Sequence, residues 1–180
     1  LASILAGGLM GVLMSFMSVS LKLNQTVVGL GLNLLASGLT FYLYRISYVV
    51  DGDFEIPRIE VFQNIEIPLL SKIPFLGPIL FNQNILTYFA LLMVPAIWFF
   101  LYRTRHGLLI RGLGEYPRAV DVKGVSVDKF RYLAVMFGGM MAGLGGSFLT
   151  IGSSGIFVQE ISAGRGWLAI VIVIAGNWKP

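Results

Sequence analysis

Four long apolar stretches, separated by polar segments, dominate the pattern of the chain. They cover residues 1–21, 27–44, 85–102 and 132–151, and none has a charged residue in its middle. A run of about 20 apolar residues is long enough to cross the hydrocarbon core of a bilayer as a helix. The pattern therefore predicts four membrane-spanning helices. The shorter apolar run 167–175 predicts the start of a fifth.

Aromatic and basic side chains mark where two of these runs end. The second run closes on Tyr44 and Arg45, and the third closes on Tyr102 and Arg103. Such residues are typical of the interface between the hydrocarbon core and water. They indicate that both helices end at a membrane surface.

The composition agrees with a chain that is solvated mainly by lipid. Apolar residues make up 56% of the 180 residues, charged residues only 12%, and the mean hydropathy is +0.81. Soluble domains carry about 25% charged residues. We therefore expect an all-α, polytopic integral membrane helical bundle, in the inner or plasma membrane. Because the chain starts at a leucine within an apolar run and its last run is short, we expect this transmembrane domain, 1–180, to be incomplete at both ends.

The charges of two long loops differ and predict the orientation of the bundle. The loop 47–83 holds five acidic and two basic residues, whereas the loop 103–131 holds seven basic and three acidic residues. Positive charge in short loops marks the cytoplasmic side. The loop 103–131 is therefore predicted to be cytoplasmic and the loop 47–83 extracytoplasmic. Because the basic residues gather in one loop, the net charge of +4 does not indicate a nucleic-acid partner.

Residues that carry covalent chemistry are scarce. The chain has no cysteine and a single histidine, His106, which excludes a multi-histidine or thiolate metal site. No lysine follows a glycine, so the phosphate-binding loop G-x-x-x-x-G-K-[ST] is absent. We expect no metal, no cofactor and no catalytic residue in this chain, and an interfacial role for His106.

Small residues recur in the fourth apolar run at a spacing that brings them to one face of a helix. This spacing favours close helix packing in membranes. A flexible segment that moves during transport is the alternative. The residues concerned are Gly138, Gly139, Ala142, Gly143 and Gly146.

A short surface helix is predicted within the basic loop. Pro117 lies near its start and Gly124 at its end, and the charges between them alternate. Proline in the first turn and glycine after the last turn are typical of helix boundaries.

Several segments, in the same order, resemble the branched-chain amino acid and simple sugar class of bacterial ABC transporter permeases. Within that class the chain is most similar to nucleoside-importer permeases. The likeness rests on residues 102–108 (YRTRHGL), 112–125 (GLGEYPRAVDVKGV), 132–135 (YLAV) and 163–170 (AGRGWLAI), with 24–40 and 79–84 in support. Val120 and Val122 depart from the small residues usual in the family, and Asn177 departs from a common basic residue.

The resemblance implies a permease subunit that imports a nucleoside or a related small polar solute by alternating access. It implies cytoplasmic ATPase subunits that bind ATP and Mg, a second permease subunit in a heterodimer, and an extracytoplasmic substrate-binding lipoprotein. It also makes the segment 115–125 the coupling helix that docks on the ATPase. The coupling residues are then Glu115, Tyr116, Pro117, Arg118, Ala119, Asp121, Lys123 and Gly124.

Polar residues within and after the spanning runs are candidates for the substrate path and the outer surface. Asn33, Ser37 and Thr40 lie inside the second run, where a polar group faces protein or a water-filled cavity. Hydrogen bonds between helices are the alternative role. Glu160 and Arg165 are predicted to lie in an outer turn, where they order the turn, meet the binding protein or anchor the interface.

Three other functions stay open at this point. A permease of the same class for simple sugars or branched-chain amino acids would share every feature above. An ion-coupled secondary transporter or a membrane-embedded enzyme would need charged or metal-binding residues at membrane depth. The four spanning runs carry none in their middles, which argues against both.

Overall fold

The fold is that of a helical membrane protein. The computed structural model describes residues 1–50, 53–54, 61, 65–66, 82–158 and 160–177. Within these residues four helices are long and apolar enough to cross a membrane, namely Ala2–Ser20, Gln25–Ser47, Ile85–Arg103 and Val127–Ser154. The prediction of a polytopic α-helical bundle is confirmed.

The first two helices form a hairpin. α1 (Ala2–Ser15) continues as the π-helical turn η1 (Phe16–Ser20), and after a short link α2 (Gln25–Tyr48) runs back. The fully buried hydroxyl of Ser15 donates to the carbonyl of Gly11 at 2.8 Å, which satisfies it within its own helix. α2 is longer at both ends than the predicted run 27–44, because interfacial polar residues end the membrane span without ending the helix.

Four two-residue strands were not predicted. β1 (Val49–Val50) pairs antiparallel with β2 (Asp53–Phe54), and β3 (Ile65–Glu66) with β4 (Asn82–Gln83). They belong to the loop predicted over 47–83. Most of that loop lies outside the described residues.

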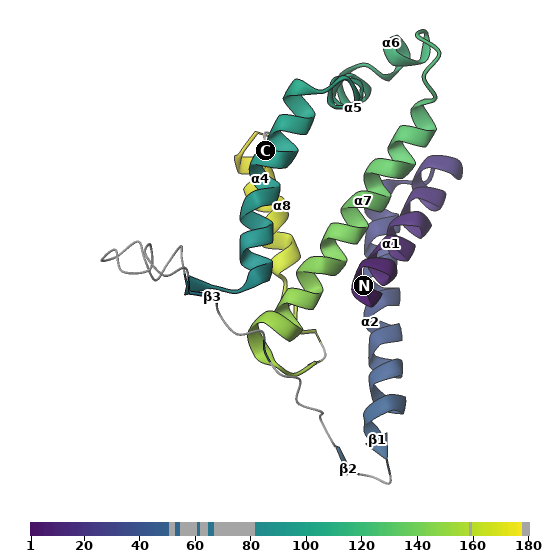
Figure 1. Ribbon diagram of the computed structural model, residues 1–180. Helices are drawn as coiled ribbons and strands as arrows, with labels where there is room; N and C mark the ends of the chain where they lie inside the picture. Colours follow the sequence, from purple (N-terminus) through teal and green to yellow (C-terminus); the bar gives the residue numbers. More distant parts are fainter. Residues whose placement is uncertain (51–52, 55–60, 62–64, 67–81, 159, 178–180) are drawn as a thin grey trace.

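The second half begins with α4 (Ile85–Arg103), which is followed at once by α5 (Arg105–Glu115) and the one-turn α6 (Pro117–Asp121). α7 (Val127–Ser147) then runs back and ends as the π-helix η2 (Phe148–Ser154), and α8 (Arg165–Ala175) closes the described chain. Figure 1 shows α5 and α6 at one end of the bundle and β1 and β2 at the other.

Two helix boundaries in this half differ from prediction. The polar loop predicted over 103–131 is largely helical, since α5 fills its first third and α7 begins at Val127. The charged residues Asp128, Lys129 and Arg131 thus lie in the first turns of α7. Charge ends a membrane span but not a helix, and an acidic residue in a first turn even favours the helix.

Little of the chain is buried against itself. At most 17% of any spanning helix is buried, and the buried apolar side chains of the described residues are Val28, Leu113 and Val120. The large apolar side chains of α2, α4 and α8 are mostly exposed. Lipid and neighbouring protein must therefore cover them, as expected for membrane helices.

Candidate functional site

α4 and α5 meet in a closely packed junction. The Thr104 hydroxyl donates to the Phe100 carbonyl at 2.6 Å and accepts from the Gly107 amide at 3.1 Å, so one side chain closes α4 and caps α5. Gly107 is buried, and a Cβ there would lie 2.6 Å from the Leu101 Cα. Only glycine lets the two helices meet this closely.

Side chains also tie α5 to α4. The Arg111 guanidinium carbon lies 4.5 Å from the ring centroid of Tyr102, a cation–π contact. The Trp98 ring in turn stacks on the Tyr102 ring, with ring centroids 5.7 Å apart. These contacts tie the first turns of α5 to the last turns of α4.

The predicted coupling segment 115–125 is two elements rather than one helix. Glu115 ends α5, Tyr116 breaks the helical path at φ −145° and ψ 83°, and α6 spans Pro117–Asp121. Gly124, at φ 77°, then turns the chain toward α7. The predicted start was wrong because the residue before a proline avoids the helical conformation.

Val120 fixes α6 on α5. Its side chain is buried, and its methyl group would lie 3.3 Å from a Cβ added at Gly112. A larger residue at position 120 fits because Gly112 leaves room for it. This accounts for one of the three residues that depart from the family pattern.

Apart from Val120, most of the segment 115–125 is exposed. We call this segment, together with α5, the elbow. Val122 is 89% exposed and Tyr116 is 62% exposed. Pro117 is half-buried, and His106 in the first turn of α5 is exposed. The other predicted coupling residues are also exposed, namely Glu115, Arg118, Ala119, Asp121, Lys123 and Gly124. Exposed apolar side chains flanked by charges are typical of a protein interaction surface.

The three polar residues predicted for the substrate path lie on one face of α2. Asn33, Ser37 and Thr40 are separated by four and three residues, the spacing of helical neighbours on the same side. Ser37 and Thr40 are half-buried and Asn33 is exposed. The Ser37 hydroxyl donates to the Oε1 of Glu160 at 3.5 Å.

The predicted outer turn is a tight turn between η2 and α8. The amide of Ala163 donates to the Glu160 carbonyl at 2.8 Å, and the amide of Arg165 donates to the Ser162 carbonyl at 2.8 Å. Glu160 and Ala163 adopt left-handed backbone conformations. Arg165 starts α8, whereas Glu160 lies against α2.

Glycines bring α1 and α7 into backbone contact. A Cβ at Gly7 would fall on the Gly139 carbonyl and 3.0 Å from the Gly143 Cα, and a Cβ at Gly11 would lie 2.9 Å from the Met136 Cα. The hydroxyls of Ser20 and Tyr132 meet farther along the same pair. The two helices are therefore antiparallel.

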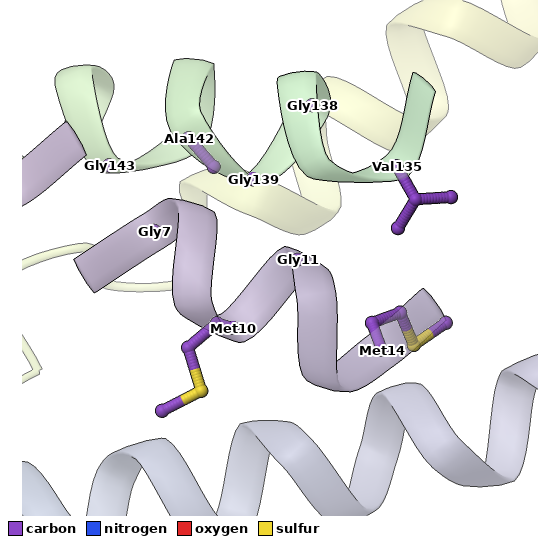
Figure 2. Close-up of a pocket in the computed structure, with 9 residues that line it drawn as sticks. All are labelled: Gly7, Met10, Gly11, Met14, Val135, Gly138, Gly139, Ala142 and Gly143. Carbon is purple, nitrogen blue, oxygen red and sulfur yellow. The ribbon is translucent and has the colours of Figure 1, made fainter. Parts of the chain in front are cut away.

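The structure selects among the predicted packing glycines (Figure 2). Gly139 and Gly143 form the contact with α1, and Ala142 lines the adjoining open groove of about 350 Å³. Gly138 also lines the groove, but a Cβ added at Gly138 or Gly146 meets no described atom within 4 Å. Gly7 and Gly11 were not singled out from the sequence, although their four-residue spacing is the expected signal.

Asn84 is a third residue that sequence reasoning missed. Its side chain is buried, accepts from the Leu86 amide at 3.2 Å and donates to the Gly152 carbonyl at 3.3 Å. It thus caps α4 and links that helix to η2. An asparagine just before an apolar run is the signal for such a cap.

No cluster of three or more His, Cys, Asp or Glu side chains is present in the described part of the chain. The arrangement supplies a packed helix pair, a polar helix face and an exposed elbow.

Comparison with known proteins places these features in context. The sequence profile described as "Branched-chain amino acid transport system / permease component" matches residues 1–180. A guanosine ABC transporter permease protein of Bacillus subtilis is 35% identical over all of this chain and 56% of its own length. A nucleoside ABC transporter permease protein of Lactococcus lactis is 36% identical over 99% of this chain and 57% of its own length.

Another relative points to a different solute. A protein of Haloferax volcanii, provisionally named a glucose ABC transporter permease, is 38% identical over 92% of this chain and 50% of its own length. The chain thus spans about half the length of the curated relatives it matches. No solved structure matches it significantly.

Proposed function

Since the chain belongs to the family of branched-chain amino acid transport system permease components, we propose that it forms part of the translocation path of an ATP-driven importer for nucleosides. The observation that carries this proposal is the exposed elbow of α5 and α6, at one end of a bundle in which four helices are long and apolar enough to cross a membrane. Two relatives that match nearly the whole chain are named as guanosine and nucleoside permeases.

The elbow is proposed to be cytoplasmic and to receive the ATPase. Its basic charge supports this side of the membrane, and the contact between Ser20 and Tyr132 brings the link after α1 to the same end. The ATPase would seat against Tyr116 and Val122. Through Val120, Gly107 and the Arg111–Tyr102 contact, movement of α6 would reach α5 and then α4.

Transport itself is proposed to follow alternating access. ATP binding by the partner subunits, with Mg, would draw the two elbows of a permease pair together and tilt α4 and α7. An extracytoplasmic binding lipoprotein would deliver the solute at the opposite end. The chain would need no cofactor of its own, because the energy enters through its partners.

A simple sugar is the second candidate solute, and the Haloferax relative named for glucose favours it. Guanosine and glucose share one chemical feature, a pair of neighbouring ring hydroxyls. A branched-chain amino acid has no such pair.

The test is ATP-dependent uptake of labelled guanosine and glucose by membrane vesicles that hold the full-length permease with its ATPase, second permease and binding protein. Val122→Asp places a charge on the exposed elbow without touching a buried contact, so we expect uptake and ATPase binding to fall at least tenfold. Ser126→Asp is the matched control, because it adds the same charge at the N-cap of α7, where aspartate is favoured.

Scrambling residues 115–125 should abolish uptake altogether. Uptake that persists without ATP and follows an ion gradient would show that the importer assignment is wrong. Equal uptake by the Val122→Asp and Ser126→Asp variants would show that the ATPase does not dock on the elbow. The solute assignment would be unaffected.

A further inference from the structure

A carboxylate lies halfway along a spanning helix. Ser37 is 12 residues from the first and 11 from the last residue of α2, so at 1.5 Å per residue it lies about 17 Å from either end. The Ser37 hydroxyl donates to Glu160 Oε1 at 3.5 Å. Glu160 therefore lies beside the middle of α2, a helix long and apolar enough to cross a membrane, although it belongs to the connection between η2 and α8.

The connection reaches this depth by turning back along α2. The rings of Phe157 and Tyr44 lie 6.0 Å apart near the end of α2, whereas Glu160 contacts Ser37, seven residues earlier in that helix. The left-handed conformations of Glu160 (φ 55°), Ala163 (φ 43°) and Gly164 (φ 76°) then reverse the chain into α8. A strained turn of this kind persists where the surrounding structure holds it.

A carboxylate at this depth cannot face lipid. A charged side chain at the centre of a bilayer costs about 3 kcal/mol or more, and such residues face a protein interior or a water-filled cavity. The face of α2 that carries Asn33, Ser37 and Thr40 must therefore be covered by protein or water in the assembled transporter. This is the position expected for the wall of a polar translocation path.

The carboxylate has acceptor capacity to spare. An ionised carboxylate offers about four acceptor positions, and within the described residues the recorded side-chain donor to Glu160 is the single hydroxyl of Ser37 at 3.5 Å. The side chain itself is exposed. Further donors to this carboxylate come from water, from the rest of the assembled transporter or from a passing solute.

We propose that Glu160 binds the substrate by accepting hydrogen bonds from two neighbouring ring hydroxyls, those of a ribose or of a simple sugar. This inference rests on the proposed function and specifies the solute chemistry of the path. Carboxylates recognise sugar hydroxyls in the same way in dinucleotide-binding folds. Asn33, on the same face of α2, supplies both a donor and an acceptor to the rest of the solute.

The transport experiment compares two solutes that differ only in these hydroxyls. Uptake of guanosine and 2′,3′-dideoxyguanosine is measured well below half-saturation in the full-length, assembled transporter, and each variant is expressed as a ratio to wild type for the same solute. The selectivity of the binding protein cancels in that ratio. Glu160→Gln should lower guanosine uptake roughly tenfold, because the charge-assisted hydrogen bonds are lost, and change dideoxyguanosine uptake less than about twofold.

Asp128→Asn is the matched control for loss of a carboxylate, because Asp128 lies in the first turn of α7, on a different element from the polar face of α2. It should leave both ratios near one. Equal losses for both solutes in Glu160→Gln would mean that Glu160 only shapes the turn, and no loss for either would mean that it does not contact the solute. Either result overturns the proposal.

A second measurement does not depend on guanosine being the solute. The chain has no cysteine, so Glu160→Cys in a cysteine-free full-length permease can be labelled with a membrane-impermeant thiol reagent. We expect labelling, and protection by guanosine or glucose, whereas Leu34→Cys on α2 should stay unlabelled in lipid. Absence of labelling at position 160 overturns the inference. If glucose protects position 160 from labelling and guanosine does not, the nucleoside assignment is wrong, and Glu160 remains the residue that binds the ring hydroxyls of the solute.

Discussion

The contact between α1 and α7 and the contact between α2 and Glu160 join distant parts of the chain in opposite ways. In the first, paired glycines bring two backbones together between residues 3–11 of α1 and 135–143 of α7. In the second, one hydroxyl and one carboxylate meet at 3.5 Å, next to an aromatic pair. The first is a packed scaffold, and the second is a polar contact that water or solute can replace.

The difference follows from the solvent. Lipid is as apolar as the side chains of these helices, so burial of apolar area does not hold helices together in a membrane. Close packing of small residues does, and it tolerates no extra atom. A polar contact exposed on the described chain contributes little to stability and is available to a ligand instead. We therefore expect substitutions in the scaffold to change stability, and substitutions around Glu160 to change transport.

The largest effect should come from Gly139→Ala, because its new methyl group would fall on the Gly7 carbonyl of α1. We expect a loss of about 3 kcal/mol in the free energy of unfolding, at the upper end for overpacked sites. Thermal unfolding of the purified full-length permease in detergent measures it. Gly138→Ala, one residue away and with open space around it, should not destabilise. Equal losses in both variants would contradict the backbone contact.

The next largest effect is expected for Asn84→Ala, which removes the cap of α4 and its link to η2. Loss of an N-cap side chain costs about 1–2 kcal/mol. Asn84→Asp keeps the capping oxygen but not the amide donor to Gly152, so it should recover part of the loss. If the aspartate and alanine variants unfold at the same temperature, the cap contributes nothing measurable.

A smaller effect is expected where η1 and α7 meet through the hydroxyls of Ser20 and Tyr132. Tyr132→Phe and Ser20→Ala should each lower stability by only about 0.5 kcal/mol, the lower end for a hydrogen bond, because this contact is exposed. The double variant should lose little more than either single variant, because both remove the same bond. Additive losses would mean that the two hydroxyls act independently.

The smallest effect on stability is expected for Ser37→Ala, below about 0.5 kcal/mol, since surface substitutions away from packed features are nearly neutral. Guanosine uptake should nevertheless fall about twofold to threefold, because Glu160 loses the hydroxyl that positions it. Comparison of unfolding temperature with the maximal uptake rate of the same preparation separates the two effects. A large loss of stability would place Ser37 in the scaffold and remove the distinction between the two contacts.

The spanning helices could be predicted from the sequence, because long uncharged runs leave the bilayer as the only adequate solvent. Their ends could not, since α2 and α7 extend into polar residues that are equally stable as helix outside the membrane. The break at Tyr116 could have been predicted, because Pro117 follows it and the residue before a proline avoids the helical conformation. The predicted helix nevertheless began at Glu115, one residue before the break.

The sequence by itself determined that this protein is a multi-pass membrane chain of a known permease family, because hydrophobic length, charge placement and ordered motifs are local properties of the chain. It also marked the polar face of α2 and the glycines of α7 as candidates. Only the tertiary structure decided which glycines touch another backbone and that Glu160 lies at the middle of α2. Both depend on contacts between residues more than 100 positions apart in sequence, and spacing along one segment carries no information about its partner.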